Sequence, residues 1–410
     1  MPTASEHWLR RAVIYSILVD RFAGFAASRA GDWDLPVFIG GNLGTITSKL
    51  DYLVELGINT LWLSPIYRGV DYHGYHITDF RAVDSRFGNL GDLKSLIEQC
   101  RRRGLRVIAD LVPNHCHESH PFFQEALRNK KSPYRQWFNF DKQDRYATFL
   151  GCAWLPKLNL ENSQARRYMI DSALYWQDLG LDGFRIDHVI GVSHGFLQDL
   201  SIALKKANPE SVLFGEAVMD TAGLRKHHKT FFLKDSVRRR RTGLSQESMQ
   251  KDYRGVIDGV LDFAFHRLLV RHVRGRLPAP SLNAAIQRHF AGYPSDFSLV
   301  LFLDNHDMNR LFCECLRRHG DRSKAIDALK AAFLIMMKCA RHYRHPVAIY
   351  YGDEILLNQV APMQDHFPHQ DLLVRRTMSW SPDSTQIAFY AFVSKHLKEL
   401  HPQTRPDDPR

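Results

Sequence analysis

The sequence lacks the cysteine patterns of a zinc site or a disulfide framework. Its 410 residues contain six cysteines and no Cys-x-x-Cys pair. The one close pair, Cys313 and Cys315, is separated by a single residue and is a weak metal signal. We interpret the cysteines as reduced, partly buried thiols of a cytoplasmic protein.

Long apolar runs are also missing. No uninterrupted apolar run approaches the roughly 20 residues that cross a membrane, and residues 1–11 contain no apolar core of a signal peptide. We therefore expect a soluble, unsecreted chain with no membrane partner.

The positive charge is not accompanied by interleaved aromatic residues. Lys and Arg number 55 against 44 Asp and Glu, for a net charge of +11. The two basic runs, Arg101–Arg103 and Arg238–Arg241, lack the aromatic side chains on which bases stack. A solvated basic surface is the favoured interpretation, and no nucleic-acid partner is expected. Nucleic-acid binding stays the alternative, and it would weaken steeply with salt.

No glycine-rich phosphate turn follows the first predicted strand, where Asp20-Arg21-Phe22 stands instead. This argues against a doubly wound open sheet, the competing architecture. Eight apolar runs, each followed by helical sequence, predict an α/β protein with a (β/α)8 TIM barrel. The strands are expected at residues 12–19, 59–63, 106–111, 183–187, 211–216, 256–263, 297–303 and 346–350. Helices are expected at 48–56, 90–103, 163–179, 195–208, 282–290, 324–341 and 386–400.

One long, irregular, aromatic-rich stretch interrupts this alternation after the third strand. We predict a catalytic barrel made of residues 1–115 and 161–410, with residues 116–160 as a small inserted subdomain. With 44% hydrophobic and 24% charged residues, the composition suits one large domain with an insertion, although it would also suit two domains.

Polar residues follow several of the predicted strands. In a barrel of this kind the carboxyl ends of the strands share one mouth, so these residues are catalytic candidates. Isolated acids there can instead cap the next helix, and this alternative is strongest for Asp110 and Asp262. The candidates are Asp110, Asn114, His115, Arg185, Asp187, His188, Glu216, Asp262, His306 and Asp307.

Paired carboxylates suit the cleavage of a glycosidic bond, because one attacks or activates water while the other donates a proton. Arg185, two residues before Asp187 on the same strand face, is expected to keep Asp187 ionised as the nucleophile. Glu216 ends an apolar run, so desolvation is expected to hold it protonated.

Four motifs in this order resemble the α-amylase family of retaining, α-glucan-active barrels, and the resemblance runs from Tyr15 to about Leu400. They are Asp110-Leu111-Val112-Pro113-Asn114-His115, Gly183-Phe184-Arg185-Ile186-Asp187-His188, Phe214-Gly215-Glu216-Ala217 and Phe302-Leu303-Asp304-Asn305-His306-Asp307. Each lies at a predicted strand end, which makes the joint match specific.

The resemblance implies that Asp187 is the nucleophile, Glu216 the general acid/base and Asp307 the carboxylate that stabilises the transition state. It implies substrate-binding roles for Tyr75, His115, Arg185, His188 and His306, with the ring of Tyr75 stacking on the sugar. The resemblance implies no required cofactor and leaves a bound calcium ion open. Asn114 matches a position that binds calcium in some relatives, whereas Asp32 and Asp34 offer too few oxygens for a calcium cage.

Leu155-Pro156-Lys157-Leu158-Asn159 is similar to a motif of the neopullulanase, cyclomaltodextrinase and maltogenic amylase branch. The family usually continues into a C-terminal β domain and the branch begins with an N-terminal one; neither is expected here. Val218 stands where an aromatic residue often follows the acid/base. The implied activity is hydrolysis of α-1,4 or α-1,6 bonds in malto-oligosaccharides, cyclodextrins or related glucans. A 4-α-glucanotransferase and a catalytically silent α-glucan-binding barrel are the alternatives.

Overall fold

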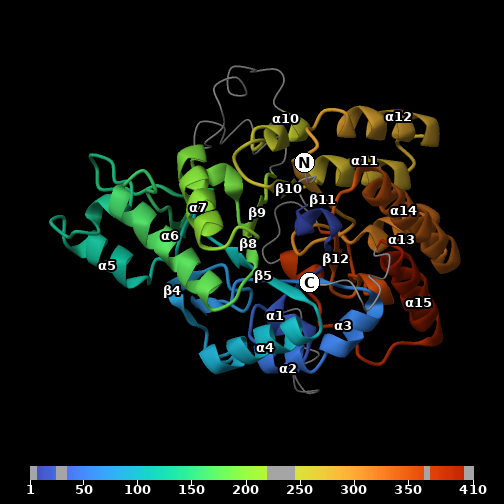
Figure 1. Cartoon of the computed structure of the whole chain (residues 1–410), viewed down its shortest axis with the longest axis horizontal. Coiled ribbons are helices and arrows are strands. Elements are labelled where there is room, and N and C mark those ends of the chain that lie inside the picture. Colours follow the sequence, from blue (N-terminus) through green and yellow to red (C-terminus); the bar gives the residue numbers. More distant parts are fainter. Residues whose placement is uncertain (1–6, 25–34, 219–244, 364–369, 401–410) are drawn as a thin grey trace, which may run out of the picture.

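Eight parallel strands close into a barrel in the computed structural model, which describes residues 7–24, 35–218, 245–363 and 370–400 (Figure 1). Their order around the barrel is β1-β12-β11-β10-β9-β8-β5-β2. The predicted (β/α)8 barrel is therefore confirmed. The strands are β1 (Val13–Ile17), β2 (Thr60–Leu63), β5 (Arg106–Leu111), β8 (Gly183–Ile186), β9 (Val212–Gly215), β10 (Gly259–Leu261), β11 (Ser298–Phe302) and β12 (Val347–Tyr350).

The strands are apolar throughout because both of their faces are covered. Ile14, Trp62 and Phe214 belong to a core cluster inside the barrel. Their neighbours along the strands, such as Val13 and Leu61, belong to the larger cluster between barrel and helices. Alternate residues of each strand thus enter different cores, which explains why no polar alternation marks these strands in the sequence.

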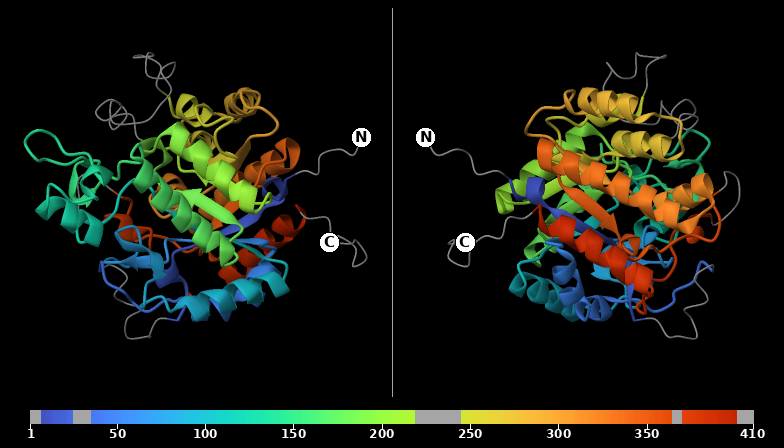
Figure 2. Two further views of the ribbon diagram at one scale, coloured as in Figure 1. Left: turned by 60° about the vertical axis from the view of Figure 1, so that its left-hand side comes forward. Right: turned by 90° about the vertical axis from the view of Figure 1, so that its right-hand side faces the viewer.

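Helices surround the barrel in all three views (Figures 1 and 2). Local signals set several of their ends: α3 stops at Gly57, which adopts the left-handed φ of 101° predicted for a helix end. The α-helices are α1 (Val19–Phe22), α2 (Leu43–Thr47), α3 (Leu50–Leu56), α4 (Leu90–Arg102), α5 (Pro121–Arg128), α6 (Ser163–Asp178), α7 (His194–Ala207), α10 (Gln246–Lys251), α11 (Phe263–Val273), α12 (Ala279–Phe290), α13 (Leu311–His319), α14 (Arg322–Tyr343) and α15 (Ser384–Lys398). Short 3-10 helices are η1 (Trp8–Arg11), η3 (Arg135–Trp137), η4 (Val189–Gly191), η6 (Asp353–Ile355) and η7 (Gln370–Leu373).

The predicted strand at 256–263 is too long. It shortens to β10 because the Asp262 side chain accepts a hydrogen bond from the Phe265 N–H and starts α11, a helix that the sequence pattern missed. Helix α13 was missed as well; it is only nine residues long, and its buried residues include Glu314 and two cysteines.

The inserted stretch 116–160 is more regular than predicted. It contains α5, η3 and a hairpin of β6 (Thr148–Phe149) and β7 (Cys152–Pro156). The part that carries α5 projects to one side of the barrel (Figures 1 and 2). A bridge from His115 to Lys157 connects its ends, and a bridge from Phe138 to Leu158 connects its middle to its C-terminal end. A second hairpin, β3 (Tyr67–Gly69) with β4 (Ile77–Val83), holds the loop that contains Tyr75.

Some predicted features lie outside the described residues, namely Asp32, Asp34 and the basic run Arg238–Arg241. In the part of the chain that the structure describes, none of the helices combines the length and the apolar character needed to cross a membrane. All six cysteines are described and are free thiols.

Candidate active site

Arg185 lies between three carboxylates at the carboxyl ends of neighbouring strands. The parallel register of β5 and β8 sets Asp110 opposite Arg185, and Nη1 lies 2.9 Å from Asp110 Oδ2. The same Nη1 lies 2.9 Å from Asp187 Oδ1, and Nη2 lies 2.7 Å from Glu216 Oε1. All four side chains are buried. Sheet register therefore assembles residues that are 106 positions apart in the sequence, from Asp110 to Glu216.

One guanidinium cannot neutralise three buried carboxylates, so their ionisation is disfavoured. Burial raises the pKa of Asp110 to about 6, of Asp187 to about 7 and of Glu216 to about 8, although Arg185 opposes each increase. The expectation that desolvation raises the pKa of Glu216 agrees with this. Arg185 opposes the rise in the pKa of Asp187, as expected, but burial outweighs it, and Arg185 also contacts the other two carboxylates.

Main-chain geometry orients Glu216. The N–H of His188 donates a hydrogen bond to Glu216 Oε2 at 3.1 Å. His188 adopts a left-handed φ of 43°, which is uncommon for a residue other than glycine and often marks a functional position. Its ring packs edge-on against Phe149, with centroids 4.8 Å apart. A backbone conformation that is sparsely populated thus supplies a donor to one carboxylate of the cluster.

Asp307 has a separate cationic partner. Arg375 Nη2 donates to Asp307 Oδ1 at 2.6 Å, and His306 Nε2 lies 3.1 Å from Oδ2. Partial burial opposes ionisation, but His306 and Arg375 outweigh it and lower the pKa of Asp307 to about 2. Asp307 is therefore ionised under conditions in which Glu216 is protonated.

Tyr75 connects the Asp110 side of this cluster to His306. Its hydroxyl donates to Asp110 Oδ2 at 2.5 Å and lies 2.8 Å from His306 Nε2. The two rings are stacked, with centroids 5.3 Å apart and planes 12° apart. Burial lowers the pKa of His306 to about 4, so this ring is neutral at pH 7. Residues from β5, β8 and the loops after β3 and β11 thus form one connected network.

A model of the alpha amylase catalytic domain matches residues 16–403, which is most of the chain. The protein belongs to the alpha-amylase family.

Named relatives agree with this assignment. Alpha-amylase 2 from Dictyoglomus thermophilum is 36% identical over 96% of this chain, and a cyclomaltodextrinase from a Bacillus species is 30% identical over 97%. The chain spans 64% and 67% of the lengths of these relatives. The solved structure of a cyclic alpha-maltosyl-(1→6)-maltose hydrolase from Arthrobacter globiformis superposes with a TM-score of 0.75 at 27% identity, covering 96% of this chain and 83% of that one.

Two other predicted residues of this alpha-amylase-family chain, Asn114 and His115, lie beside the insertion. The His115 ring packs against Phe149 with centroids 4.6 Å apart, and burial lowers the pKa of His115 to about 3. Asn114 Oδ1 is buried and accepts no hydrogen bond within the described chain. Lys157 pairs with His115 across a β-bridge, and the N–H of Leu158 donates to the Asn114 carbonyl at 3.0 Å.

Calcium is the ion that the resemblance associates with Asn114. The ion takes six to eight oxygen ligands, whereas the Asn114 side chain contacts a nitrogen: its Nδ2 lies 3.2 Å from His115 Nδ1. Among the residues that the structure describes, the one cluster of three His, Cys, Asp or Glu donors that could hold a metal lies elsewhere and does not include Asn114.

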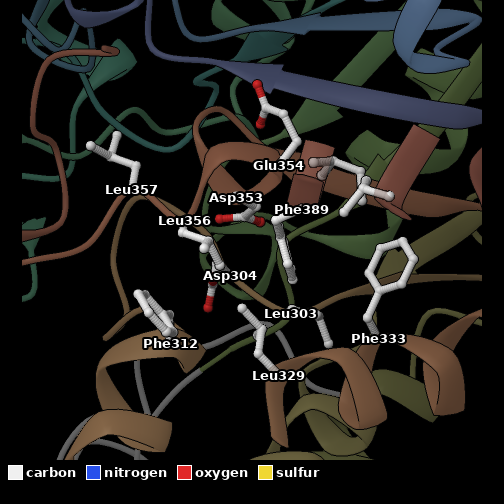
Figure 3. A pocket seen from close by; sticks show the side chains of 12 residues that line it. Leu303, Asp304, Phe312, Leu329, Phe333, Asp353, Glu354, Leu356, Leu357 and Phe389 are labelled. Atoms are coloured by element: carbon white, nitrogen blue, oxygen red, sulfur yellow. The ribbon is translucent and has the colours of Figure 1, made fainter. Parts of the chain in front are cut away.

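Asp262 of the predicted set, and Asp304, which lies in the fourth motif, have structural contacts instead. Asp262 caps α11 and forms a 2.8 Å ion pair with His289, as the capping alternative predicted. Asp304, the first acid of the fourth motif, lines an enclosed, mostly apolar pocket together with Asp353 and Glu354 (Figure 3). There it accepts a hydrogen bond from the Leu311 N–H at 2.5 Å.

Arg375 and Phe149 are site residues that the sequence did not reveal. Arg375 contacts Asp307 from the stretch after η7, and Phe149 contacts two histidines of the site from β6. Neither residue belongs to a periodic segment or to one of the four motifs. Only the long-range packing of the insertion and of the chain after β12 brings them to the barrel mouth.

Proposed function

We propose that this chain is a retaining α-glucoside hydrolase that cleaves α-1,4 bonds, and α-1,6 bonds as a second linkage, in malto-oligosaccharides, cyclodextrins or related glucans. The observation that carries the proposal is the arrangement of Asp187 and Glu216 on one guanidinium, Arg185, beside an ionised Asp307. In retaining glycosidases the two catalytic carboxyl groups lie about 5 Å apart, and in inverting ones they lie farther apart. Asp187 and Glu216 contact the same guanidinium, which favours the shorter separation of a retaining enzyme.

The names of the relatives support the substrate class. They include cyclomaltodextrinases, neopullulanase 2 and maltogenic amylases, and the hydrolase from Arthrobacter globiformis has been solved in complex with maltose.

In the first step, an oxygen of ionised Asp187 forms a bond to the anomeric carbon while the bond from that carbon to the leaving oxygen breaks. Glu216 donates its proton to the leaving oxygen. The raised pKa of Glu216 provides this proton, and the His188 N–H then stabilises the carboxylate that remains. Asp307 stabilises the positive charge that develops on the sugar.

In the second step, the Glu216 carboxylate takes a proton from water while the water oxygen bonds to the anomeric carbon. The bond between that carbon and Asp187 breaks, and both carboxyl groups return to their initial states. Two displacements at one carbon retain the anomeric configuration. A sugar hydroxyl in place of water would give transfer, so product analysis decides between the two outcomes.

The network around Tyr75 holds the reacting sugar in this scheme. The ring of Tyr75 stacks on the sugar face, while His115, His188 and His306 contact its hydroxyls. The low pKa values of His115 and His306 keep these rings neutral, so each offers one donor and one acceptor to a hydroxyl group.

Incubation with maltotriose, β-cyclodextrin and pullulan tests the proposal. We expect shorter products that retain the α-anomer, and we expect Asp187→Asn to lose turnover while its circular dichroism spectrum stays unchanged. Products longer than maltotriose would identify a transferase instead. Absence of cleavage and of transfer on all three glucans would overturn the proposal.

The free thiols support a reducing compartment. We therefore also propose a cytoplasmic location, because all six cysteines are unpaired and five of them are buried.

A further inference from the structure

Three potential metal ligands meet in the loop between β3 and β4, outside the carboxylate cluster. His76 Nδ1 is in close contact with Asp71 Oδ2, and His73 Nε2 lies 3.9 Å from the same oxygen. One donor atom from each residue lies within 4.8 Å of the others. The sequence spacing, Asp-x-His-x-x-His, is short, so a single tight loop can present all three donors to one point.

The donor types select the ion. Two imidazoles and one carboxylate suit zinc and neighbouring divalent metals, whereas calcium and magnesium prefer oxygen ligands. The side chains of Asp71, His73 and His76 are 34%, 13% and 19% exposed, which leaves a bound ion in reach of water as a further ligand. The salt bridges of Asp71 within the described residues are both to these histidines, so no Lys or Arg occupies the place of the cation.

The site is connected to the residue proposed to stack on the sugar. His73 Nδ1 accepts a hydrogen bond from the Tyr75 N–H at 3.1 Å, which places the proton of the neutral ring on Nε2. A neutral imidazole carries only one N–H proton. When an ion binds His73 Nε2, this proton must therefore move to Nδ1. The Tyr75 N–H then loses its acceptor, so metal binding changes a main-chain contact of Tyr75.

We propose that Asp71, His73 and His76 bind one divalent cation of the zinc class at the edge of the active site. The ion bridges the two ends of the loop that carries Tyr75. The donors belong neither to the proposed catalytic carboxylates nor to the surroundings of Asn114. The inference therefore does not depend on the proposed hydrolase activity.

Titration of the chelator-treated full chain with Zn²⁺ in a calorimeter tests the proposal, and Co²⁺ provides an optical readout. We expect one tight site per chain and visible Co²⁺ absorption typical of nitrogen and oxygen ligands. His76→Gln and Asp71→Asn should each weaken Zn²⁺ binding by about tenfold or more, because each removes one of three protein ligands.

His319→Gln is the matched control, because His319 is an exposed histidine at the end of α13, far along the chain from the site. Its affinity for Zn²⁺ should equal that of the unaltered chain. Thermal unfolding of each variant without metal verifies that the fold is intact. A chain that binds no Zn²⁺, or one whose binding is equally affected by His319→Gln and His76→Gln, would overturn the proposal. Unchanged binding in both site variants would overturn it too.

Discussion

Arg375 contacts both the carboxylate of Asp307 and the main-chain carbonyl of His306, the residue before it. Nη2 donates to Asp307 Oδ1 at 2.6 Å, and Nε donates to the carbonyl of His306 at 2.9 Å. Asp371 Oδ2 lies 2.5 Å from Nη1 on the opposite side of the guanidinium. Arg375 therefore fixes both the position and the charge of a carboxylate that we place at the transition state.

Replacement of Arg375 by alanine should lower kcat/KM by about 100-fold, the order seen when one preorganised electrostatic contact is removed. Without Arg375 the pKa of Asp307 should rise from its value of about 2, but the acidic limb of the pH profile, which Asp187 sets near pH 7, should not move. Steady-state kinetics on maltotriose from pH 4 to 9 measure both effects. Arg376→Ala is the neighbouring control, since the Arg376 Nη1 donates to the Asn358 carbonyl and not to Asp307.

The hydroxyl and the ring of Tyr75 can be separated by mutation. Tyr75→Phe keeps the ring but removes the hydrogen bond to Asp110 and the contact with His306. We expect kcat/KM to fall about tenfold in Tyr75→Phe and considerably further in Tyr75→Ala, which also loses the stacking surface. Equal losses in the two variants would contradict a stacking role for the ring.

The sequence predicts the barrel well because each strand is apolar on both faces and several helices end at glycines. It also predicts which acids follow the strands. It does not predict that Arg185 is shared among three carboxylates, because that depends on the register between β5, β8 and β9. Arg375 and Phe149 were missed for a related reason: only tertiary packing brings them to the site, and local pattern carries no information about it.

Glu216→Gln should make the protein more stable at pH 8 than the unaltered chain. Glu216 has a folded-state pKa of about 8 against an ordinary value of 4.5, so folding disfavours its ionised form. The contribution of Glu216 to the free energy of unfolding is then fully retained below about pH 4.5, and it is lost as the pH rises toward 8. Gln is neutral throughout, so the gain should be near zero at pH 4 and on the order of 4 kcal/mol at pH 8. Urea unfolding at the two pH values measures it, and a gain of the same size at both would contradict the raised pKa.

Calcium should leave the thermal stability unchanged. The Asn114 side chain contacts a nitrogen, His115 Nδ1, whereas calcium needs six to eight oxygen ligands. After chelator treatment, the Tm in 5 mM Ca²⁺, about the upper range for weak sites, should equal the Tm without added metal. A clear increase in Tm on addition of Ca²⁺ would show that the folded chain binds calcium and would contradict this prediction.

The dependence of kcat/KM on pH should distinguish the roles of Asp187 and Glu216. Asp187 must be ionised to attack, so activity should fall as the pH drops below about 7; Glu216 must be protonated, so activity should fall above about 8. The two groups titrate as a pair, and the maximum should therefore lie between these values.

Removal of the Glu216 carboxyl group should abolish only the fall in activity on the alkaline side of the pH profile. With an aryl α-maltoside, whose leaving group needs no proton, Glu216→Ala should still undergo the first step, and the fall above pH 8 should disappear. Added azide should then restore turnover, because this anion attacks the glycosyl-enzyme without a general base. Without azide, Asp187→Ala should stay inactive on the same substrate, since no nucleophile replaces the lost carboxylate on that face of the sugar. With azide, it should give the inverted β-glycosyl azide, whereas Glu216→Ala should give the retained α-glycosyl azide. The α-glycosyl azide from Asp187→Ala, together with the β-glycosyl azide from Glu216→Ala, would reverse the two assignments.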